Sequence, residues 1–237
     1  MSAEFTSSER GTTGQIGVPI ITVDGPSGSG KGTLAVLLAE RLGWHYLDSG
    51  ALYRILGVYA EAQSVALDDA EAVAQLAAGL EVRFDGEQVF VFEEDMTNKL
   101  RNEEAGALAS QVAAHLPVRA AIVDLQRSFA TAPGLVADGR DMGTEIFADA
   151  PLKIFLDASA QVRAERRYNQ LKNKGLVVSL RDLLKSIQER DERDRARTAS
   201  PLRPAQDAIV LDSSNLSIDA VLKLVLTEVE HRGLGSA

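Results

Sequence analysis

The stretch VPIITVDGPSGSGKGTLAVLLAERL, residues 18–42, contains three patterns in direct succession. Residues 18–24 form an almost continuous apolar run, which is typical of a strand buried on both faces of a parallel sheet. Residues 25–33 (GPSGSGKGT) are rich in glycine, and residues 31–42 have the leucine spacing of a helix. A buried strand, a glycine loop and a helix in this order predict an α/β fold whose first loop binds phosphate.

Each residue type in this glycine loop suits phosphate binding. Glycines let the backbone turn tightly and direct successive N–H groups inward, and the start of the helix adds N–H groups and partial positive charge. Lys31 supplies a full positive charge for the β- and γ-phosphates of a nucleotide. The usual P-loop has Ser or Thr directly after the lysine, whereas here Gly32 precedes Thr33. The predicted phosphate-binding residues are Gly25, Pro26, Ser27, Gly28, Ser29, Gly30, Lys31, Gly32 and Thr33.

Strand and helix patterns alternate along most of the remaining chain. Short apolar runs predict further buried strands, and amphipathic spacing predicts the helices between them. Ser49 stands where a serine side chain can cap a helix. The predicted strands are 44–48, 135–138, 152–157 and 208–212, and the predicted helices are 49–62, 68–78, 97–115, 117–130, 160–174, 179–197 and 217–231. This alternation predicts a doubly wound parallel sheet of the P-loop NTPase type.

The pattern changes between residues 80 and 92. Two short runs, 80–84 and 89–92, flank the Asp85–Gly86 pair, which is a turn signal of β-hairpins. A hairpin among alternating strands and helices predicts a small inserted unit, at about 64–116. We therefore expect one domain over residues 18–237 that contains this insert. Residues 1–17, rich in Ser, Thr and Gly, are expected to form a loose tail.

The composition is that of a globular protein with an uneven distribution of charge. The 237 residues include no Cys, which excludes disulfides, thiolate metal sites and cysteine nucleophiles. The net charge of −9 disfavours binding to long nucleic acids or to an anionic membrane. Residues 160–203 nevertheless carry twelve Lys or Arg and six Asp or Glu, a local balance of +6. A basic stretch in an acidic chain suggests a small polyanionic ligand, and a solvated helix with ion pairs is the alternative.

The N-terminal residues carry no targeting pattern. They lack the basic start and the apolar core of a signal peptide. No run in the chain approaches the roughly 18 apolar residues that a membrane helix needs. We expect a soluble, cytoplasmic protein with neither a membrane nor a nucleic acid as its partner.

Several separated motifs resemble those of the bacterial cytidylate kinases, a family of nucleoside monophosphate kinases with a P-loop. The GKGT ending of the glycine loop is similar to the loop of nucleoside monophosphate kinases in general. The other motifs occur in the order and spacing of the cytidylate kinases, from about Pro19 into the final helix. They are LDSGALYR (47–54), ASQVAAHLPVR (109–119), ADGRDMGT (137–144), KIFLDAS (153–159) and ERDERDRAR (189–197).

The resemblance implies a reaction and a set of site residues. A monomeric enzyme would transfer the γ-phosphate of ATP, bound on the glycine loop with Mg2+, to CMP or dCMP. This reaction needs positive charge around both phosphates and the exclusion of water. By resemblance, Arg54, Arg140 and Arg197 would hold the acceptor phosphate, Arg190 and Asp194 would hold the pentose hydroxyls, and Ser49, Ser110, Arg119 and Asp141 would lie at or near the cytosine.

The choice of base has a physical interpretation. Cytosine presents an amino donor followed by two acceptors, so that a carboxylate suits the first and a guanidinium suits the others. The resemblance assigns Asp141 to the amino group. Uracil would place an acceptor oxygen against Asp141 instead, and the unpaired buried groups would cost about 1–3 kcal/mol or more. We therefore expect CMP and dCMP to be preferred to UMP.

Two further groups of residues belong to the ATP side. Asp138 ends an apolar strand, as the acidic residue of a Walker B motif does, and with Thr33 it could orient magnesium or its waters. A turn and helix-capping pair is the alternative for Asp138 and Asp141. By resemblance, residues at about 159–182 form a lid over the triphosphate. The candidates for contact with ATP from this lid are Arg163, Arg166 and Arg167.

Three other functions would use part of the same sequence. A kinase acting on UMP, AMP or shikimate would share the loop, but Ser110, Arg119 and Asp141 favour cytosine. A GTPase-like switch would need an Asn/Thr-Lys-x-Asp motif that reads guanine, and Asn173–Lys174 is not followed by an Asp in that place. A nucleic-acid binder using the basic helices is disfavoured by the balance of −15 on the rest of the chain.

Overall fold

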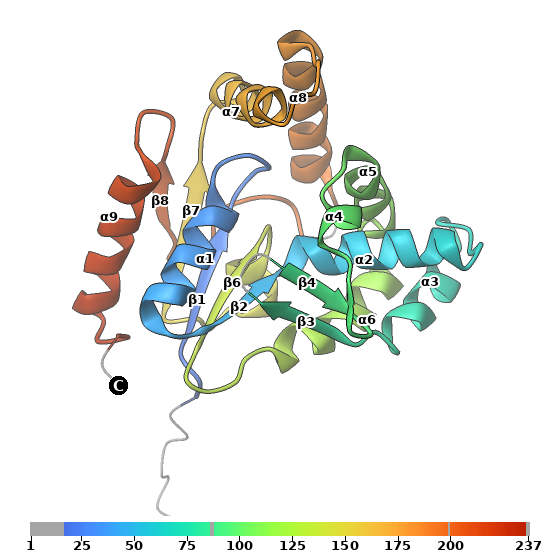
Figure 1. Ribbon diagram of the computed structural model, residues 1–237. Helices are drawn as coiled ribbons and strands as arrows, with labels where there is room; N and C mark the ends of the chain where they lie inside the picture. The colour runs from blue at the N-terminus through green and yellow to red at the C-terminus, as the bar shows by residue number, and fades with distance from the viewer. Residues whose placement is uncertain (1–16, 86–87, 199, 236–237) are drawn as a thin grey trace, which may run out of the picture.

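The centre of the molecule is a five-stranded parallel sheet in the order β2-β6-β1-β7-β8 (Figure 1). The computed structural model describes residues 17–85, 88–198 and 200–235. Helices cover both faces of the sheet, and the predicted doubly wound α/β fold is confirmed. The strands are β1 (Ile20–Asp24), β2 (His45–Asp48), β6 (Leu135–Gly139), β7 (Leu152–Asp157) and β8 (Ile209–Asp212).

The chain changes direction across the sheet at β1. It passes from β1 to the edge strand β2, returns to β6, and then crosses β1 to reach β7 and β8. In open α/β sheets ligands bind at such a change of direction, outside the carboxyl ends of the strands. Asp24 and Gly139 are paired at this end of β1 and β6. The glycine loop that follows Asp24 therefore begins at the edge where a ligand is expected.

Alternating side chains of the buried strands fill two separate cores. In β6, Val136 packs into the core under α1 and α9, whereas Leu135 and Ala137 pack into the core under α2 and α6. Successive side chains of a strand point to opposite faces, so an unbroken apolar run is needed to fill both cores. The flanking helices are α1 (Lys31–Leu42), α2 (Ser49–Ala62), α6 (Leu116–Ser128) and α9 (Ile218–His231).

The start of α2 differs from the prediction that Ser49 caps it. Asp48 is the N-cap, and its Oδ1 accepts a hydrogen bond from the N–H of Ala51 at 2.9 Å. Asp48 ends β2 with an extended backbone, which brings its carboxylate to the first turn of the helix. Ser49 is the first helical residue, and its hydroxyl turns to the side chain of Gln126 instead.

The inserted unit contains an antiparallel sheet of three strands and packs against α2. Both expected hairpin strands are present, while residues 86–87 of the turn between them lie outside the described residues. The predicted helix 97–115 is divided in two, because the side chain of Asn102 accepts from the N–H of Ala105 and caps a new helix. The elements are α3 (Ala70–Ala77), β3 (Val82–Asp85), β4 (Gln88–Val91), β5 (Glu94–Asp95), α4 (Thr97–Leu100) and α5 (Glu103–Val112).

Three more elements lie beyond the carboxyl edge of the sheet. The helices α7 (Ala160–Asn173) and α8 (Leu180–Ala196) follow β7 and form the top of the molecule in Figure 1. A short π-helical turn, η1 (Met142–Ile146), follows β6 and was not predicted. None of the helices in the described ranges combines the length and the hydropathy of a transmembrane segment.

Candidate functional site

The glycine loop between β1 and α1 has the backbone shape of a phosphate cradle. Gly28 and Gly30 have left-handed φ angles of 80° and 96°, which glycine adopts without strain. A Cβ at Gly25 would lie 2.1 Å from the carbonyl oxygen of Leu156, so no side chain fits there. The loop leads directly into the N-terminus of α1 at Lys31, where free N–H groups and the helix dipole favour an anion.

Gly32 departs from the usual pattern for a structural reason. A Cβ at this position would lie 3.0 Å from Oδ2 of Asp138, closer than an ordinary van der Waals contact. The same carboxylate lies 3.0 Å from the Nζ of Lys31. Burial raises the pKa of Asp138 while Lys31 opposes that rise, and burial lowers the pKa of Lys31. The missing side chain therefore lets α1 approach the carboxylate that ends the apolar run of β6.

A cavity of about 140 Å³ lies beside the loop and gathers the residues predicted for the acceptor nucleotide. Its walls come from α2, α5, α6, α8 and the end of β6, which are far apart in the sequence. The residues predicted for the acceptor that line it are Ser49, Arg54, Ser110, Arg119, Arg140, Asp141, Arg190, Asp194 and Arg197. Asp138, which was predicted for the magnesium side, lines it as well. Tertiary structure thus brings all of these residues together at one place.

Lys31 and four of the arginines around this acceptor cavity are paired with carboxylates. Such pairs hold each cation in a fixed orientation and offset the accumulation of positive charge. The paired groups nevertheless face a space where an anion could bind. The pairs are Lys31–Asp138, Arg54–Asp48, Arg119–Asp141, Arg140–Asp194 and Arg197–Asp194.

Arg54 is oriented by the residue that caps its own helix. While Oδ1 of Asp48 accepts from Ala51, Oδ2 accepts from the Arg54 guanidinium at 2.6 Å. Burial alone would raise the pKa of Asp48, but Arg54, Lys31 and the N–H of Ala51 hold that pKa below its usual value. Asp48 is therefore ionised at neutral pH and fixes Arg54 one turn into α2.

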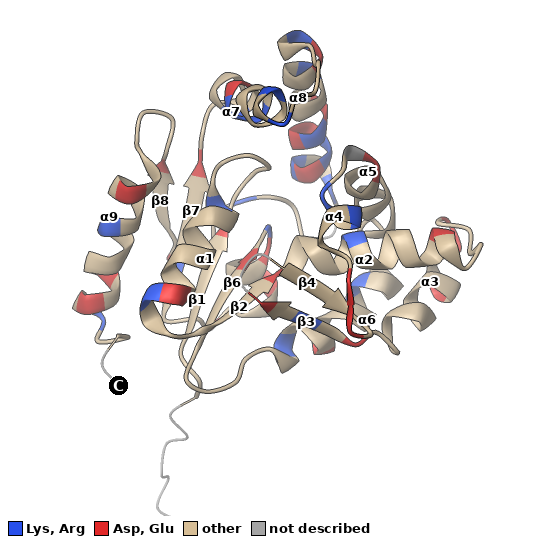
Figure 2. Cartoon of the chain, in the orientation of Figure 1, with Lys and Arg blue, Asp and Glu red and all other residues tan. Residues whose placement is uncertain are grey.

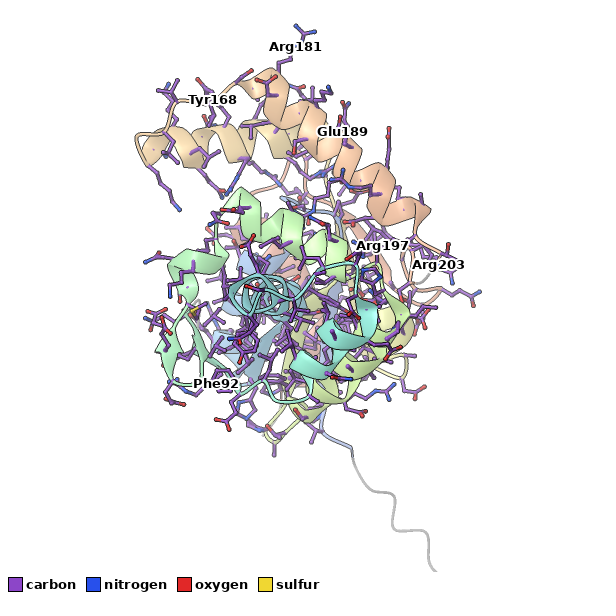
Figure 3. All side chains as sticks on the ribbon, turned by 90° about the vertical axis from the view of Figure 1, so that its right-hand side faces the viewer. Phe92, Tyr168, Arg181, Glu189, Arg197 and Arg203 are labelled. Carbon is purple, nitrogen blue, oxygen red and sulfur yellow. The ribbon has the colours of Figure 1, made fainter. Side chains whose placement is uncertain are left out.

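Asp194 joins two of the arginines predicted to bind phosphate. Its side chain is buried, its Oδ2 accepts from Nε of Arg140 at 3.2 Å, and its Oδ1 accepts from the guanidinium of Arg197. The predicted helix 179–197 ends at Ala196, and Arg197 is its C-cap. Figure 3 shows α8 running from Arg181 at its outer end to Arg197 near the body of the molecule. The inner end of α8 thus reaches the acceptor cavity.

Another wall holds the side chains predicted to meet a nucleobase. Arg119 donates to the carboxylate of Asp141, and both residues are buried. The hydroxyl of Ser110 donates to a backbone carbonyl one turn earlier, at 3.0 Å, and keeps its oxygen as an acceptor. The hydroxyl oxygen of Ser49 accepts from the side-chain amide of Gln126 at 2.8 Å, which leaves its proton for another acceptor. This wall therefore offers both donors and acceptors to a planar polar ligand.

A larger cleft of about 1160 Å³ extends over the glycine loop beneath α7 and α8. Of the predicted lid residues, Arg163, Arg166 and Arg167 all line it. Arg163 is only 2% exposed, and it donates to Asp191 of α8 and to the loop carbonyl of Ser27 at 3.0 Å. Arg166 donates to another loop carbonyl at 3.2 Å. The first turns of α7 are thereby bonded to the loop.

Acidic residues are interleaved with the basic residues of α7 and α8 (Figure 2). Part of this arrangement matches the alternative stated in the sequence analysis, a solvated helix with ion pairs. Lys185 and Glu189, for example, form an exposed pair at 3.8 Å. Arg190, on the inner side, instead donates to the hydroxyl of Ser27 in the glycine loop at 3.4 Å. The two helices thus combine a solvated outer face with an inner face directed at the loop.

Comparison with known proteins assigns the chain to a family. The sequence matches the model of the cytidylate kinases over residues 21–231. The chain belongs to the cytidylate kinase family. The cytidylate kinase of Stutzerimonas stutzeri (strain A1501) is 58% identical over 223 residues, which cover 92% of this chain and 97% of that one. The cytidylate kinase of Methylococcus capsulatus is 53% identical over 216 residues, which cover 90% of this chain and 97% of that one.

Similarity to solved structures is much weaker. A structure of shikimate kinase from Acinetobacter baumannii in complex with shikimate is 15% identical, with a TM-score of 0.43, and the match covers 90% of this chain and 94% of that one. The α/β fold of this cytidylate kinase family member is therefore assigned from its own strand order and parallel register.

Three residues at the site of this family member were not singled out from the sequence. Asp48 lines both the cavity and the cleft, Asp24 bonds the turn after Asp141, and Gln126 lies behind Ser49. Asp24 and Asp48 carry a usable signal, since each ends a strand at the edge where α/β proteins bind ligands. Gln126 lies in the middle of α6, and no local pattern marks it.

The residues of this cytidylate kinase family member fit a magnesium ion held mainly by nucleotide phosphates. In the described part of the chain, no group of three or more His, Cys, Asp or Glu side chains is arranged to hold a metal. Mg2+ commonly keeps several waters and takes one or two carboxylates together with phosphates. Asp138 supplies a buried carboxylate at the loop, and Thr33 lines the cleft. These oxygens suit such a weakly chelated ion.

Proposed function

We propose that this protein transfers the γ-phosphate of ATP to CMP or dCMP, producing ADP and CDP or dCDP. One observation carries the proposal: the arginine-lined acceptor cavity adjoins the cleft over the glycine loop. The two spaces share Lys31, Asp48 and Arg54 in their walls. A donor phosphate on the loop and an acceptor phosphate in the cavity would therefore meet between Lys31 and Arg54.

The proposed chemistry is positioning and electrostatic stabilisation. Phosphoryl transfer requires little covalent work from the protein, but it requires fixed positive charge where negative charge is shared. Arg54, Arg140 and Arg197 would hold the acceptor phosphate, because guanidinium groups form paired hydrogen bonds to phosphate oxygens. Lys31 would contact the β- and γ-phosphates of ATP. The existing ion pairs support this role, because cations already held in place need little reorganisation.

Magnesium is the implied metal of this reaction. A bound magnesium ion would supply positive charge to the nucleotide phosphates while negative charge develops during transfer. Asp138 and Thr33 would hold the ion, chiefly through waters. Burial raises the pKa of Asp138, and the neighbouring Lys31 opposes that rise.

Nucleotide selection would follow from polar complementarity inside the acceptor cavity. The Asp141 carboxylate would accept from the amino group of cytosine, and Arg119 would donate to the ring acceptors with Ser110 nearby. A uracil oxygen would face Asp141 without a proton between them, which costs about 1–3 kcal/mol or more. Arg190 and Asp194 would take the pentose hydroxyls, although both oxygens of Asp194 already accept from arginines. A hydroxyl would have to use the remaining lone pairs.

The outer elements would control access to this site. We infer that residues at about 159–182 act as a lid over ATP and that residues at about 64–116 act as the acceptor-binding insert. Closure over the cleft would exclude water and suppress hydrolysis of ATP. We also infer a cytoplasmic monomer, as the resemblance of the sequence motifs to the cytidylate kinases implies. Size-exclusion chromatography with light scattering tests that oligomeric state.

Production of ADP from ATP and Mg2+ tests the proposed function. The assay compares CMP, dCMP, UMP, AMP and no acceptor, for the unmodified protein and for Asp141→Ala. We expect turnover with CMP and dCMP, weak turnover with UMP, and a loss of about 10- to 200-fold in kcat/KM for CMP in the variant. Asp124→Ala removes an exposed carboxylate from the same helix as Arg119 and should leave these values unchanged.

Each contrary outcome has a defined meaning. Equal turnover of UMP and CMP would retain the kinase and reject the role given to Asp141. The absence of any acceptor-dependent turnover would reject the proposed reaction.

A further inference from the structure

Asp24 connects the strand that enters the phosphate loop with the turn that carries Asp141. It is the last residue of β1 and is 5% exposed. Its Oδ1 accepts from the N–H of Met142 at 2.9 Å, and its Oδ2 accepts from the N–H of Gly143 at 2.8 Å. These two residues directly follow Asp141 and begin η1. A carboxylate on the ATP side therefore holds the backbone next to the proposed base-contacting residue.

Asp141 occupies the position where an aspartate ordinarily caps its own helix. The first N–H groups of a helical turn have no partner within it, and an Asp at the N-cap commonly accepts from them. Here the Asp141 side chain makes no capping bond to η1. Its carboxylate turns to Arg119 in the acceptor cavity instead. Asp24, from a different strand, has taken over the capping of η1.

The contact between Asp24 and this turn is tight as well as polar. A Cβ at Gly143 would lie 2.8 Å from Oγ1 of Thr22 and 3.3 Å from Oδ2 of Asp24. The absence of a side chain at Gly143 lets the turn rest directly on β1. The first residues of η1 are thereby fixed relative to the strand that leads into the loop.

The surroundings of Asp24 make a carboxylate unfavourable there. Burial raises its pKa to about 7, the two N–H groups oppose the rise, and the charges of Asp141 and Asp138 add to it. A neutral or apolar residue would avoid this cost if Asp24 only filled space in the core. A carboxylate at this position satisfies the N–H groups of Met142 and Gly143.

We propose that Asp24 is a positioning residue for nucleobase selection: by capping η1 it leaves the Asp141 carboxylate free to pair with Arg119 and to meet the base. This inference rests on the role of Asp141 under the proposed function. Without the Asp24 acceptors, the Asp141 side chain would rotate toward the orphaned N–H groups of its own turn and leave the cavity.

The test uses Asp24→Asn and Asp24→Ala in the full-length protein. Asn retains one acceptor and places an NH2 group against the other N–H, whereas Ala removes both acceptors. We expect the ratio of kcat/KM for CMP to that for UMP to fall roughly tenfold in Asp24→Asn, and further in Asp24→Ala. The KM for ATP should stay within about twofold, because the loop glycines and Lys31 are untouched.

Two control variants separate positioning from simple destabilisation. Thr22→Val lies on the same strand beside the same turn, and it removes a buried hydroxyl that has no hydrogen-bond partner among the described residues. Val225→Ala weakens the core under α1 and α9, away from the acceptor cavity. Both variants should keep the unmodified ratio, whatever their melting temperatures.

A double variant tests whether Asp24 acts through Asp141. In an Asp141→Ala background, Asp24→Asn should cause no further fall in the CMP to UMP ratio. If Asp24→Asn keeps the ratio while Asp141→Ala loses it, the inference is overturned and the proposed function stands. If Asp141→Ala itself keeps the ratio, the base-contacting role fails and this inference fails with it. Should Asp24→Ala not fold, Asp24→Asn with the double variant still decides between these outcomes.

Discussion

At the scale of single residues, aspartate performs several tasks at the carboxyl edge of the sheet. Each of the five strands carries an aspartate at or next to its end, and the partner of each aspartate decides what it does. Asp24 caps the turn η1, Asp48 caps α2 and holds Arg54, and Asp138 pairs with Lys31. The aspartates are Asp24, Asp48, Asp138, Asp157 and Asp212.

The surroundings move the pKa values of these carboxyls in opposite directions. For Asp24, burial outweighs the two N–H donors, and the pKa rises from 3.8 to about 7. For Asp48, the neighbouring cations Arg54 and Lys31, together with the Ala51 N–H, outweigh burial, and the pKa falls. For Asp212, hydrogen bonds from Ser214 lower the pKa at the surface. A carboxyl at a strand end is therefore stabilised by its partners and not by its position alone.

The raised pKa of Asp24 predicts a specific dependence of stability on pH. Between about pH 4 and 7 the folded protein binds this proton more tightly than the unfolded chain, so the contribution of Asp24 to the free energy of unfolding falls as the pH rises. Asp24→Asn removes this titration. We expect the stability of the unmodified protein relative to the variant to fall by about 2–3 kcal/mol from pH 5 to pH 8. Urea unfolding at several pH values measures the difference, and a constant difference would contradict the prediction.

At the scale of elements, a buried ion pair joins the two helices above the sheet to the phosphate loop. Arg163 of α7 donates to both oxygens of Asp191 of α8, and the two side chains are 2% and 7% exposed. The same guanidinium donates to the carbonyls of Ser27 and Ala158. The bases of α7 and α8 are thus fixed to the loop, while Leu176 and Val177 lie exposed at the far tip.

Breaking this pair from one side is expected to cost more than replacing it. Arg163→Met leaves a buried carboxylate, and Asp191→Leu leaves a buried guanidinium. Either single variant should lose about 3–5 kcal/mol of unfolding free energy. The double variant should lose less than the sum, because two apolar side chains leave no unpaired charge. Urea unfolding of the unmodified protein, both single variants and the double variant gives the coupling energy. Additive losses would show that the two side chains do not stabilise the fold as a pair.

The control is Lys185→Met, which breaks an exposed pair on α8 and should change the free energy of unfolding by no more than about 1 kcal/mol.

At the scale of the whole molecule, the acceptor cavity lies where three bodies of the fold meet. Its walls come from the parallel sheet, from the inserted unit through α5, and from the inner end of α8. The insert also shares the core of α2 and α6, and a Cβ at Gly57 of α2 would lie only 2.7 Å from Leu108 of α5. A ligand in the cavity would touch all three bodies at once.

Binding of CMP is therefore expected to protect backbone amides of the insert. Amide exchange should slow in α5 and in the strands β3 and β4, because a nucleotide bridging the cavity adds contacts that oppose local opening. Hydrogen exchange with and without CMP measures the effect. The helix α9, which packs on the opposite core, serves as an internal reference that should not change. Equal protection of the insert in both states would contradict the expectation.

The sequence alone determined the features that depend on neighbouring residues. The buried strand at residues 18–24, the glycine loop and the following helix are local patterns, and the structure contains each of them. The hairpin strands around Asp85 were also predictable from the sequence, since the alternation of apolar and polar residues and the turn residues act over a few positions. The motifs also named Arg54, Arg119, Arg140 and Asp194, which the fold gathers around one cavity.

Only the tertiary structure decided which partner each polar group takes. The capping of η1 by Asp24 joins residues 118 positions apart, and the bond between Arg163 and Asp191 joins two helices. The predicted helix 97–115 is divided by a cap at Asn102, and α2 is capped by Asp48. Asn, Asp and Ser have almost equal propensities as N-caps, so local propensity does not select between them. A polar group must be satisfied when it is buried, but several partners can satisfy it, and packing in three dimensions selects one.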